Sequence, residues 1–355
     1  MINLKKFYKG KKVFITGATG FKGAWLCLWL NYLGAKVYGL GFNPNQNKNF
    51  FYKLNLHKKI NISLFDIRDY KKLNKLIKKI KPKIILHLAA QPLIYTSFKK
   101  PHLTFDVNFR GTLNLLDISK KINSIKSIIV VTSDKCYESS DSTKGFKETD
   151  ILGGVDPYSA SKSSTEIMVR AFRESFFTNK KVALSTGRAG NVIGGGDWSL
   201  KRLIPDCIRS LLKKQIIEIR NPNFNRPWQH VLEPLKGYLI LAKKQYESPK
   251  KFSGAWNFGT RANSLTDVKT IVSFIIKFWG SGKMKIKKNN FYEQENLQLN
   301  IKKAEKNLNW HPTYNIYDSV NITTDWYKKV MKLRQKPETV TIQQIKKYMY
   351  DSKIN

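Results

Sequence analysis

The sequence predicts an α/β fold, a doubly wound parallel sheet followed by a smaller, mostly helical C-terminal part. Three observations support this. A short apolar strand runs directly into a glycine-rich turn and an apolar helix near the N-terminus. Apolar strands then alternate with helical segments as far as residue 188. Beyond that point, glycine-dense and polar loops separate short helices, which indicates a second portion of a different kind.

The first strand, Lys12–Thr16, leads into the turn GATGFKG, which contains Gly17, Gly20 and Gly23. Glycines at this spacing allow a tight turn, close approach to a pyrophosphate, and close packing of helix on strand. The amides at the start of the following helix then face the phosphates. Because another strand, Lys36–Leu40, comes next, the turn predicts a Rossmann-like cofactor domain. The segment after that strand reads GLGFNPN and lacks the acidic residue that would bind a ribose, so the choice between NAD and NADP stays open.

The later strands and helices continue the same alternation. Ala89 and Ala90 end one strand, and their small side chains leave room for a cofactor. Ligands of such sheets bind at the carboxyl ends of the strands, where Thr132 and Ser133 fall. The strands expected are Asn61–Phe65, Lys83–Leu88, Ser127–Thr132 and Val182–Arg188, and the helices are Tyr70–Ile80, Leu103–Ile122 and residues 158–177.

These patterns divide the chain into three parts. Residues 1–187 are expected to form the cofactor domain, including the helix that begins at Pro157. Residues 188–335 are expected to form the smaller substrate domain, and 336–355 a basic tail that is either a helix or partly disordered. The second part contains the expected helices Leu203–Leu212, Leu232–Gln245, Leu265–Trp279 and Ile316–Lys332, and the strand Ile216–Arg220.

The net charge of +39 is unusually high and would ordinarily indicate a nucleic-acid or membrane partner. However, of the 64 basic residues 11 are arginine and 53 are lysine, spread along the whole chain beside abundant Asn and Ile. No basic stripe with interleaved aromatics is evident. A compositional bias with solvated lysines therefore explains the charge, and neither a nucleic acid nor a membrane is expected as partner.

The three cysteines are odd in number, far apart and outside any CxxC pattern. They predict a reduced protein with neither a disulfide framework nor a metal site. The N-terminal ten residues lack the apolar stretch of a signal peptide, and no apolar run is long enough to cross a bilayer. A cytoplasmic location is the expectation.

A tyrosine and a lysine four residues apart carry the predicted chemistry. Tyr-x-x-x-Lys occurs five times in this chain, so the pattern alone is uninformative. Tyr158 and Lys162 differ from the others because Asp156-Pro157 precedes them, a helix-start signal that places both on one face. An ammonium beside the phenol is expected to lower its pKa and to create a base usable near neutral pH.

Seven segments resemble the extended short-chain dehydrogenase/reductase family, and within it the 4,6-dehydratases of CDP-glucose. They are GATGFKGAWL, HLAAQPL, TSDKCYE, DPYSASK, RAGNVIGGGDW, RLIPD and RPWQHVLEPLKGYL, and the resemblance covers about residues 8–330 in the same order. It implies a bound NAD, a nucleotide-sugar substrate and a homo-oligomer, a dimer or a tetramer. The cofactor residues that it implies are Gly17, Gly20, Gly23, Asp66, Ile67, Ala89, Ala90, Tyr158 and Lys162.

The resemblance also implies the reaction: oxidation at carbon 4, loss of water across carbons 5 and 6, and return of the hydride to carbon 6. Tyr158 is then the base of the oxidation, with Ser133 or Thr132 on the same hydroxyl. Asp134 is the acid for the leaving hydroxyl, and Lys135 stands where dehydratases of dTDP- or GDP-sugars carry Glu. Lys135 is either the base at carbon 5, which requires it to be neutral, or a cation that polarises the ketone.

The diphosphate of the substrate requires cations and amides. Arg226 and Arg202 are the candidates because a guanidinium binds phosphate bidentately, and Asn191 could donate an amide. His230 is expected to orient a loop, and His87 to lie in the core or beside the cofactor.

Three alternatives remain open at this point. A 5-inverting dehydratase of UDP-N-acetylglucosamine also resembles the chain in its Asp-Lys pair. A 4-epimerase needs no acid–base pair beyond Tyr158, so Asp134-Lys135 argues against it. A cofactor- or RNA-binding protein without catalysis has only the charge in its favour.

Overall fold

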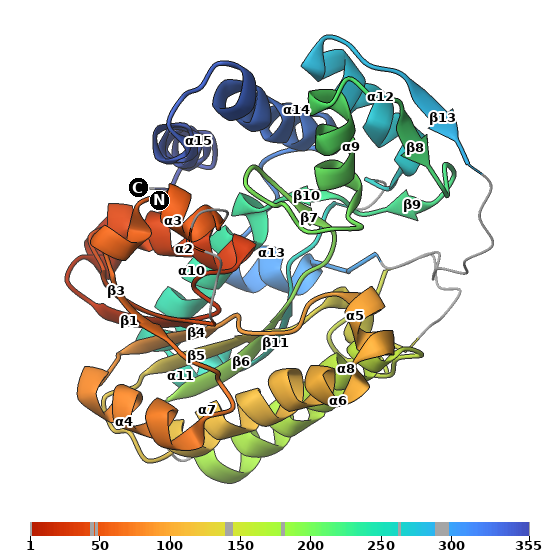
Figure 1. The fold of residues 1–355 in the computed structure, drawn as a ribbon. Coiled ribbons are helices and arrows are strands. Elements are labelled where there is room, and N and C mark those ends of the chain that lie inside the picture. The colour runs from red at the N-terminus through yellow and green to blue at the C-terminus, as the bar shows by residue number, and fades with distance from the viewer. Residues whose placement is uncertain are drawn as a thin grey trace.

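A seven-stranded parallel sheet lies at the centre of the computed structural model (Figure 1), which describes residues 2–42, 46, 49–138, 145–178, 182–261, 264–287 and 298–354. The strand order is β11-β6-β5-β4-β1-β2-β3, and every neighbouring pair is parallel. The predicted doubly wound α/β fold is therefore confirmed. The strands are β1 (Lys12–Thr16), β2 (Lys36–Gly41), β3 (Asn61–Leu64), β4 (Ile84–His87), β5 (Ser127–Val131), β6 (Ala183–Arg188) and β11 (Gly254–Asn257).

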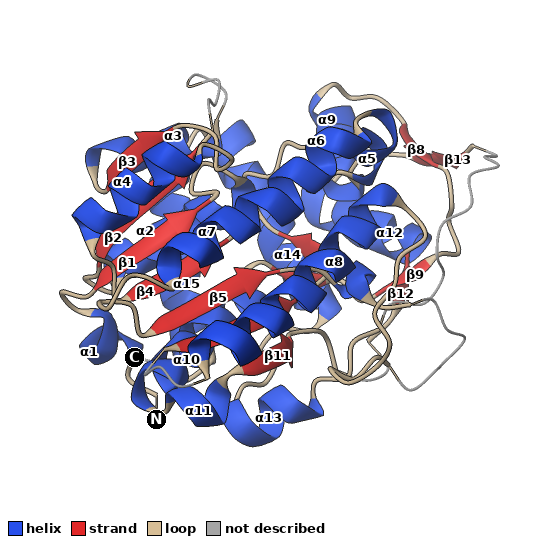
Figure 2. Ribbon diagram, turned by 90° about the horizontal axis from the view of Figure 1, so that it is seen from below, coloured by secondary structure: helices blue, strands red, loops and turns tan. Residues whose placement is uncertain are grey.

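Each face of the sheet is covered by helices because the strands are apolar on both faces. Successive residues of β1 alternate between two hydrophobic clusters, with Val13 and Ile15 in one and Phe14 in the other. One face packs against α2 (Phe21–Tyr32) and α10 (Leu232–Glu247), and α15 (Pro337–Asp351) packs on the outer side of α2 (Figure 1). The other packs against α4 (Tyr70–Ile80), α6 (Pro101–Phe105), η2 (Asp106–Arg110), α7 (Gly111–Ser119), α8 (Pro157–Phe172) and η4 (Arg173–Phe177), which Figure 2 shows from below.

Short elements near the carboxyl edge of the sheet form the smaller portion (Figure 1). Three two-stranded pairs hold its loops: β7 with β10, β8 with β13, and β9 with β12. Their bounds are β7 (Val192–Ile193), β8 (Ile217–Ile219), β9 (Asn225–Arg226), β10 (Gln229–His230), β12 (Thr266–Asp267) and β13 (Met284–Ile286). The helices of this portion are α9 (Leu203–Leu212), α12 (Val268–Trp279), α14 (Ile316–Tyr327) and η5 (Lys328–Lys332).

Short helices connect these layers. They are α1 (Leu4–Tyr8), α3 (Phe50–Lys53), η1 (Leu56–Lys58), α5 (Ile94–Lys99), η3 (Asp134–Cys136), α11 (Pro249–Phe252) and α13 (Lys302–Leu308).

The expected division at residue 187 does not follow the sheet. Strand β11 pairs with β6 as the seventh strand, and helix α10 covers the sheet opposite α8. Both come from the stretch assigned to the substrate domain. The chain returns to the sheet because the edge of β6 would otherwise expose unpaired backbone groups.

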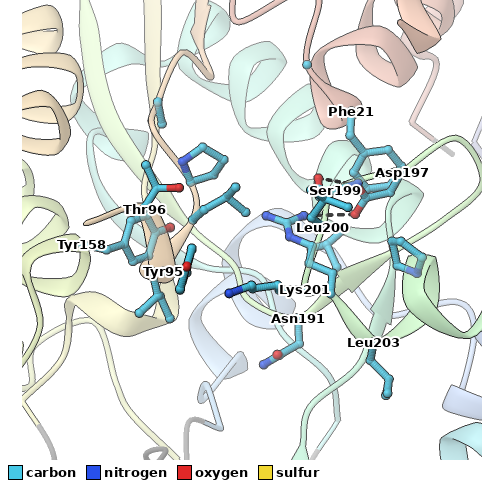
Figure 3. A pocket seen from close by; sticks show the side chains of 18 of the residues that line it. Phe21, Tyr95, Thr96, Tyr158, Asn191, Asp197, Ser199, Leu200, Lys201 and Leu203 are labelled. Atoms are coloured by element: carbon cyan, nitrogen blue, oxygen red, sulfur yellow. Dashed lines mark hydrogen bonds and ion pairs between the residues drawn. The ribbon is translucent and has the colours of Figure 1, made fainter. Parts of the chain in front are cut away.

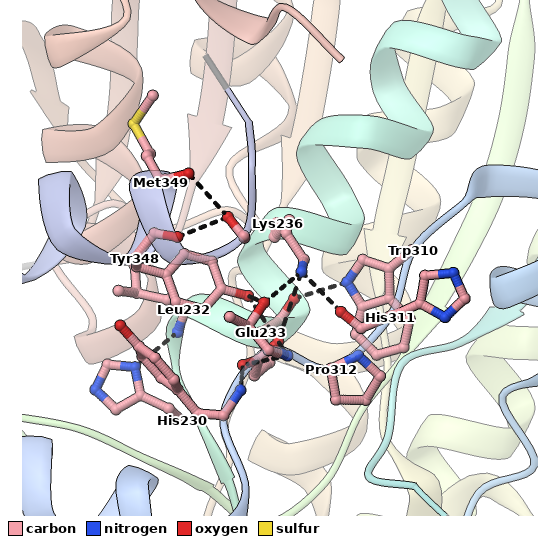
Figure 4. Close-up of polar contacts among 12 residues, drawn as sticks. His230, Leu232, Glu233, Lys236, Trp310, His311, Pro312, Tyr348 and Met349 are labelled. Atoms are coloured by element: carbon pink, nitrogen blue, oxygen red, sulfur yellow. Dashed lines mark hydrogen bonds and ion pairs between the residues drawn. The ribbon is translucent and has the colours of Figure 1, made fainter. Parts of the chain in front are cut away.

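The expected basic tail is the packed helix α15. Tyr348 donates a hydrogen bond to the buried carboxylate of Glu233 on α10 at 2.6 Å (Figure 4). Trp29 of α2 donates to the sulfur of Met349 at 3.3 Å. The lysines of α15 occupy its solvent side, so a basic composition here is compatible with a buried apolar face.

Candidate active site

A single cavity of about 2420 Å³ brings together all the residues predicted for the site. It lies at the carboxyl ends of the strands, between the sheet and the smaller portion. Tyr158 and Tyr95 project from one side, and Asn191 and Leu203 from the other (Figure 3). The predicted residues that line it are Gly17, Gly20, Gly23, Asp66, Ile67, Ala89, Ala90, Thr132, Ser133, Asp134, Lys135, Tyr158, Lys162, Asn191, Arg202 and Arg226.

The glycine turn between β1 and α2 has the geometry of a dinucleotide cradle. Gly17 has a φ of +71°, and a Cβ there would meet the backbone of Leu88 and Ala89 at 2.7 Å. A Cβ on Gly23 would lie 2.1 Å from the carbonyl oxygen of Gly17. The first turn of α2 has no side-chain cap at Gly20, so its amides remain available to an anion. The turn therefore fits a pyrophosphate.

The part of the cavity beside the ends of β2 and β3 contains Asp66 and the residue after β2. Arg68 binds the carboxylate of Asp66 through Nε at 3.0 Å and a terminal nitrogen at 2.7 Å. These hydrogen bonds hold the pKa of Asp66 below its usual value. Phe42 follows β2 and lines the cavity, exposed by 65%, while residues 43–45 lie outside the described part of the chain. Phe42 therefore occupies the position after β2 at which an acidic residue would bind a ribose.

The end of β5 places the Thr-Ser-Asp-Lys run on the cavity wall. Asp134 is only 3% exposed, and its Oδ1 accepts hydrogen bonds from the Ser133 hydroxyl at 2.9 Å and from the Lys135 amide at 2.9 Å. The Thr132 hydroxyl instead donates to Glu166. Each hydroxyl therefore donates to a carboxylate within the protein, Thr132 to Glu166 and Ser133 to Asp134.

The backbone of Gly190 holds the other side of Asp134. A Cβ on Gly190 would lie 1.6 Å from Asp134 Oδ2. The carboxylate therefore rests directly on the Cα of Gly190, which the sequence reasoning did not single out. Gln229 fixes the carbonyl of Gly190 with a hydrogen bond at 3.2 Å. The acid is thereby confined between two loops that are distant in the sequence.

Tyr158 and Lys162 project from α8 as expected, after the Asp156 side chain caps the helix. Lys162 is 5% exposed and its ammonium donates to the Val131 carbonyl at 3.4 Å. Burial lowers the pKa of Lys162 to about 8, which the charge of Glu166 opposes. Tyr158 is 9% exposed, whereas Tyr95 of another Tyr-x-x-x-Lys pair is 49% exposed.

The expected lowering of the Tyr158 pKa by Lys162 is wrong for this structure. Burial raises the pKa of Tyr158 to about 12, although a hydrogen bond with Ser133 acts in the opposite direction. The charge of Asp134 raises it further. The ammonium of Lys162 is directed at a backbone carbonyl, so desolvation of the phenol dominates.

The predicted substrate cations take two different positions. Arg202 precedes α9 and pairs with Asp197 at 3.1 Å, with a third of its side chain exposed. Arg226 is only 8% exposed, and its guanidinium carbon lies 5.4 Å from the ring centroid of Phe224. Asn191, with a φ of +48°, follows Gly190 in the loop that contacts Asp134.

Sequence reasoning missed Lys22, a cation within the glycine turn itself. It lines the cavity, and burial together with the charge of Arg202 lowers its pKa to about 8. A lysine in GATGFKG was visible, but only the tertiary fold turns it toward Asp134 and Lys162. Tyr95 and Lys201 were also missed; the Lys201 ammonium lies 3.1 Å from the ring centroid of Tyr95.

The two histidines considered earlier lie in the core. His87 is held between the hydroxyls of Thr16 at 2.6 Å and Thr112 at 2.9 Å. His230 is fully buried and accepts from the Leu232 amide at 3.4 Å, which agrees with a role in orienting its loop. Burial lowers the pKa of each to about 3.

Within the ranges given above, no helix is long and apolar enough to span a bilayer. Among the same residues, no group of His, Cys, Asp and Glu is arranged to hold a metal ion.

A Rossmann sheet with a glycine cradle, a buried Tyr-Lys pair and a second portion closing the cavity defines an extended short-chain dehydrogenase/reductase. The family model for GDP-mannose 4,6 dehydratase matches residues 14–323, and the chain belongs to this family.

Individual relatives agree with this assignment. The chain is 42% identical to the CDP-glucose 4,6-dehydratase of Salmonella typhimurium over 91% of its length and 92% of the relative's. Among solved structures, dTDP-glucose 4,6-dehydratase from Bacillus anthracis in complex with NAD has a TM-score of 0.75 at 21% identity, covering 91% of this chain and 98% of that one. UDP-glucose 4-epimerase from Thermotoga maritima has a TM-score of 0.78 at 20% identity, covering 90% and 99%. At these identities the two structures support the fold alone.

Proposed function

We propose that this protein is an NAD-dependent 4,6-dehydratase that converts CDP-glucose to CDP-4-keto-6-deoxyglucose. The observation that carries the proposal is the meeting of two residue pairs in one cavity, Tyr158-Lys162 for oxidation and Asp134-Lys135 for elimination. The 42% identical relative supports the choice of CDP-glucose.

NAD fits the cavity at the glycine cradle. Gly17, Gly20 and Gly23 leave space for the diphosphate, and the first amides of α2 face it. Ala89 and Ala90 line the cavity behind the cradle, and Lys162 would bind the nicotinamide ribose. When bound, NAD would supply the hydride acceptor for carbon 4 and the hydride donor for carbon 6.

Tyr158 takes the proton of the carbon-4 hydroxyl, while Ser133 hydrogen-bonds the same oxygen. The raised pKa of Tyr158 means that the phenol is protonated in the protein alone. Tyr158 can act as a base only when nearby positive charge lowers its pKa. The charge of Arg202 already lowers the pKa of Tyr158.

Asp134 and Lys135 serve the elimination. Asp134 is buried and lines the cavity, and in its protonated form it would give a proton to the hydroxyl leaving carbon 6. Lys135 lines the same wall and either removes the carbon-5 proton or polarises the ketone. Each step needs only groups within this cavity.

The diphosphate of the substrate would bind Arg202 and Arg226, with Asn191 donating an amide. Trp228 and Phe224 line the same end of the cavity and offer ring faces to a base. We also propose a cytoplasmic homo-oligomer, on the basis of the family resemblance and the reduced cysteines.

The test is to incubate the purified protein with NAD and CDP-, dTDP-, GDP- and UDP-glucose and to measure the alkali-induced absorbance of a 4-keto sugar. Product from CDP-glucose alone is expected. Turnover of another nucleotide sugar without CDP-glucose would overturn the substrate, and epimerisation at carbon 4 without loss of water would overturn the reaction.

A further inference from the structure

Glu166 is a buried carboxylate one helical turn beyond Lys162 on α8. It is 3% exposed and accepts hydrogen bonds on both oxygens. Thr132 donates to Oε1, while Thr186 at 2.7 Å and Arg188 at 2.8 Å donate to Oε2. A carboxylate bound by so many donors in the interior is ionised and rigid.

The carboxylate and the Lys162 ammonium attach to consecutive residues of the same strand end. Lys162 Nζ donates to the carbonyl of Val131 at 3.4 Å, and Thr132 follows directly with its hydroxyl on Glu166. The helix and the strand are thereby joined at two adjacent points beside Ser133 and Asp134. Movement of Glu166 would disturb both the lysine and the catalytic turn.

Arg188 anchors the other side of Glu166. Its second terminal nitrogen donates to the Tyr137 hydroxyl at 2.6 Å and to the Glu148 carbonyl at 3.1 Å. Tyr137 donates in turn to Asn257 of β11 at 2.8 Å. Although burial raises the pKa of Glu166, the charge and hydrogen bond of Arg188 hold it below its usual value. The negative charge of Glu166 therefore persists at neutral pH.

We propose that Glu166 is a positioning residue for the oxidation step, and that its buried carboxylate keeps Lys162 an ammonium ion at the cofactor site and fixes Thr132 beside the reacting hydroxyl. The proposal rests on the NAD-dependent function proposed above. Glu166 touches neither cofactor nor substrate and acts through Lys162 and Thr132.

The groups that face Lys162 leave Glu166 as its dominant counter-charge. On β4, His87 is neutral because burial depresses its pKa to about 3. On η3, Cys136 is a neutral thiol because burial raises its pKa. Lys22 of α2 is a second cation that repels the Lys162 ammonium, so it is not a counter-charge. The side of α8 that packs on η2 meets uncharged Asn108, which donates to Ser161 at 2.9 Å.

The consequence is a specific pH dependence of cofactor binding. A protonated Lys162 donates to the cofactor ribose, so NAD affinity should fall as pH rises through the pKa of Lys162, at about 8. Burial lowers the pKa of Lys162, and the charge of Glu166 counteracts this lowering. Glu166→Gln removes that charge, so it should move the midpoint of NAD binding to lower pH by about one unit. Isothermal titration of NAD into the protein across pH measures the midpoint directly.

Two further variants separate this role from structural damage. Glu233→Gln removes an equally buried carboxylate that does not line the cavity and that accepts from Tyr348 (Figure 4). The amides of Thr313 and Tyr314 also donate to it. It should leave the NAD midpoint unchanged. The double variant Glu166→Gln/Arg188→Met removes both members of the ion pair, so it leaves no orphan charge in the core and should fold while still shifting the midpoint.

The outcomes are distinguishable. If the unsubstituted protein binds no NAD at any pH, the proposed function itself fails. If it binds NAD and both Glu166 variants keep its midpoint, or if its affinity does not vary with pH, the role of Glu166 is refuted while the function stands. A shift equal to that of Glu233→Gln would also refute it.

Discussion

Replacing Gly190 by Ala should separate elimination from oxidation. The added Cβ would lie 1.6 Å from Asp134 Oδ2 and 2.1 Å from its Cγ, whereas real Cβ contacts are not shorter than 3.0 Å. The carboxylate must therefore move by ~1.4 Å, which breaks the Oδ1 contacts with Ser133 and Lys135. A displacement of about 1 Å at a catalytic group costs on the order of 10²-fold in rate.

The assay follows the two half-reactions of Gly190→Ala separately. Single-turnover absorbance of the reduced nicotinamide should show that oxidation continues, and the reduced form should accumulate. Deuterium incorporation at carbon 5 and formation of the 6-deoxy product should both fall by about 10²-fold. Asp134→Asn is the comparison, because the amide retains the shape of the carboxyl group but is far too weak an acid to protonate the leaving hydroxyl.

Two results would refute this reasoning. Full product formation by Gly190→Ala would mean that Asp134 need not occupy the position seen against Gly190. Loss of NAD binding would mean that the substitution disturbs the cofactor cavity as a whole. Calorimetric titration of NAD into the variant is therefore the control for an intact site.

Three other predictions follow from the site and the core. Tyr158→Phe should abolish carbon-4 oxidation, seen as no reduced cofactor in a single turnover; retained reduction would assign the base elsewhere. Lys135→Ala should permit oxidation but suppress deuterium exchange at carbon 5, and unchanged exchange would leave only the polarising role. Buried His87 and His230 titrate at about 3 when folded but near 6.5 when unfolded, so stability is complete above pH ~6.5 and falls below it by about 1.4 kcal/mol per pH unit for each histidine. Urea unfolding of His230→Gln should show a smaller acid-side loss, and an equal loss would contradict neutral burial.

Local patterns were sufficient for the cofactor half of the site. The strand–turn–helix around Gly17 places its glycines by their spacing alone, and β1, β4 and β5 agree with the expected strands within a residue or two. Tyr158 and Lys162 share a face because a helix fixes residues four apart. The capping Asp156 and Pro157 mark where that helix begins.

Contacts between distant segments could not be predicted in this way. Glu166 and Arg188 are an unremarkable pair of charges in the sequence, yet they form the buried ion pair behind Lys162. The return of β11 to the sheet likewise depends on an exposed edge of β6, which no local pattern displays. For the lysine-rich C-terminus, the sequence left a helix and partial disorder both open, because the composition does not reveal that Met349 and Tyr348 contact α2 and α10.

By itself, the sequence determined the α/β class, the glycine cradle and the resemblance that points to a dehydratase, because each depends on residues close together in the chain. The tertiary structure decided how the Tyr-x-x-x-Lys pairs at the cavity differ, because Tyr158 and Tyr95 both line it but Tyr158 is 9% exposed and Tyr95 49%. It also decided that the phenol's pKa is raised rather than lowered, because desolvation outweighs a lysine whose ammonium is directed at Val131. Burial and orientation are properties of the whole fold, and spacing along the chain does not contain them.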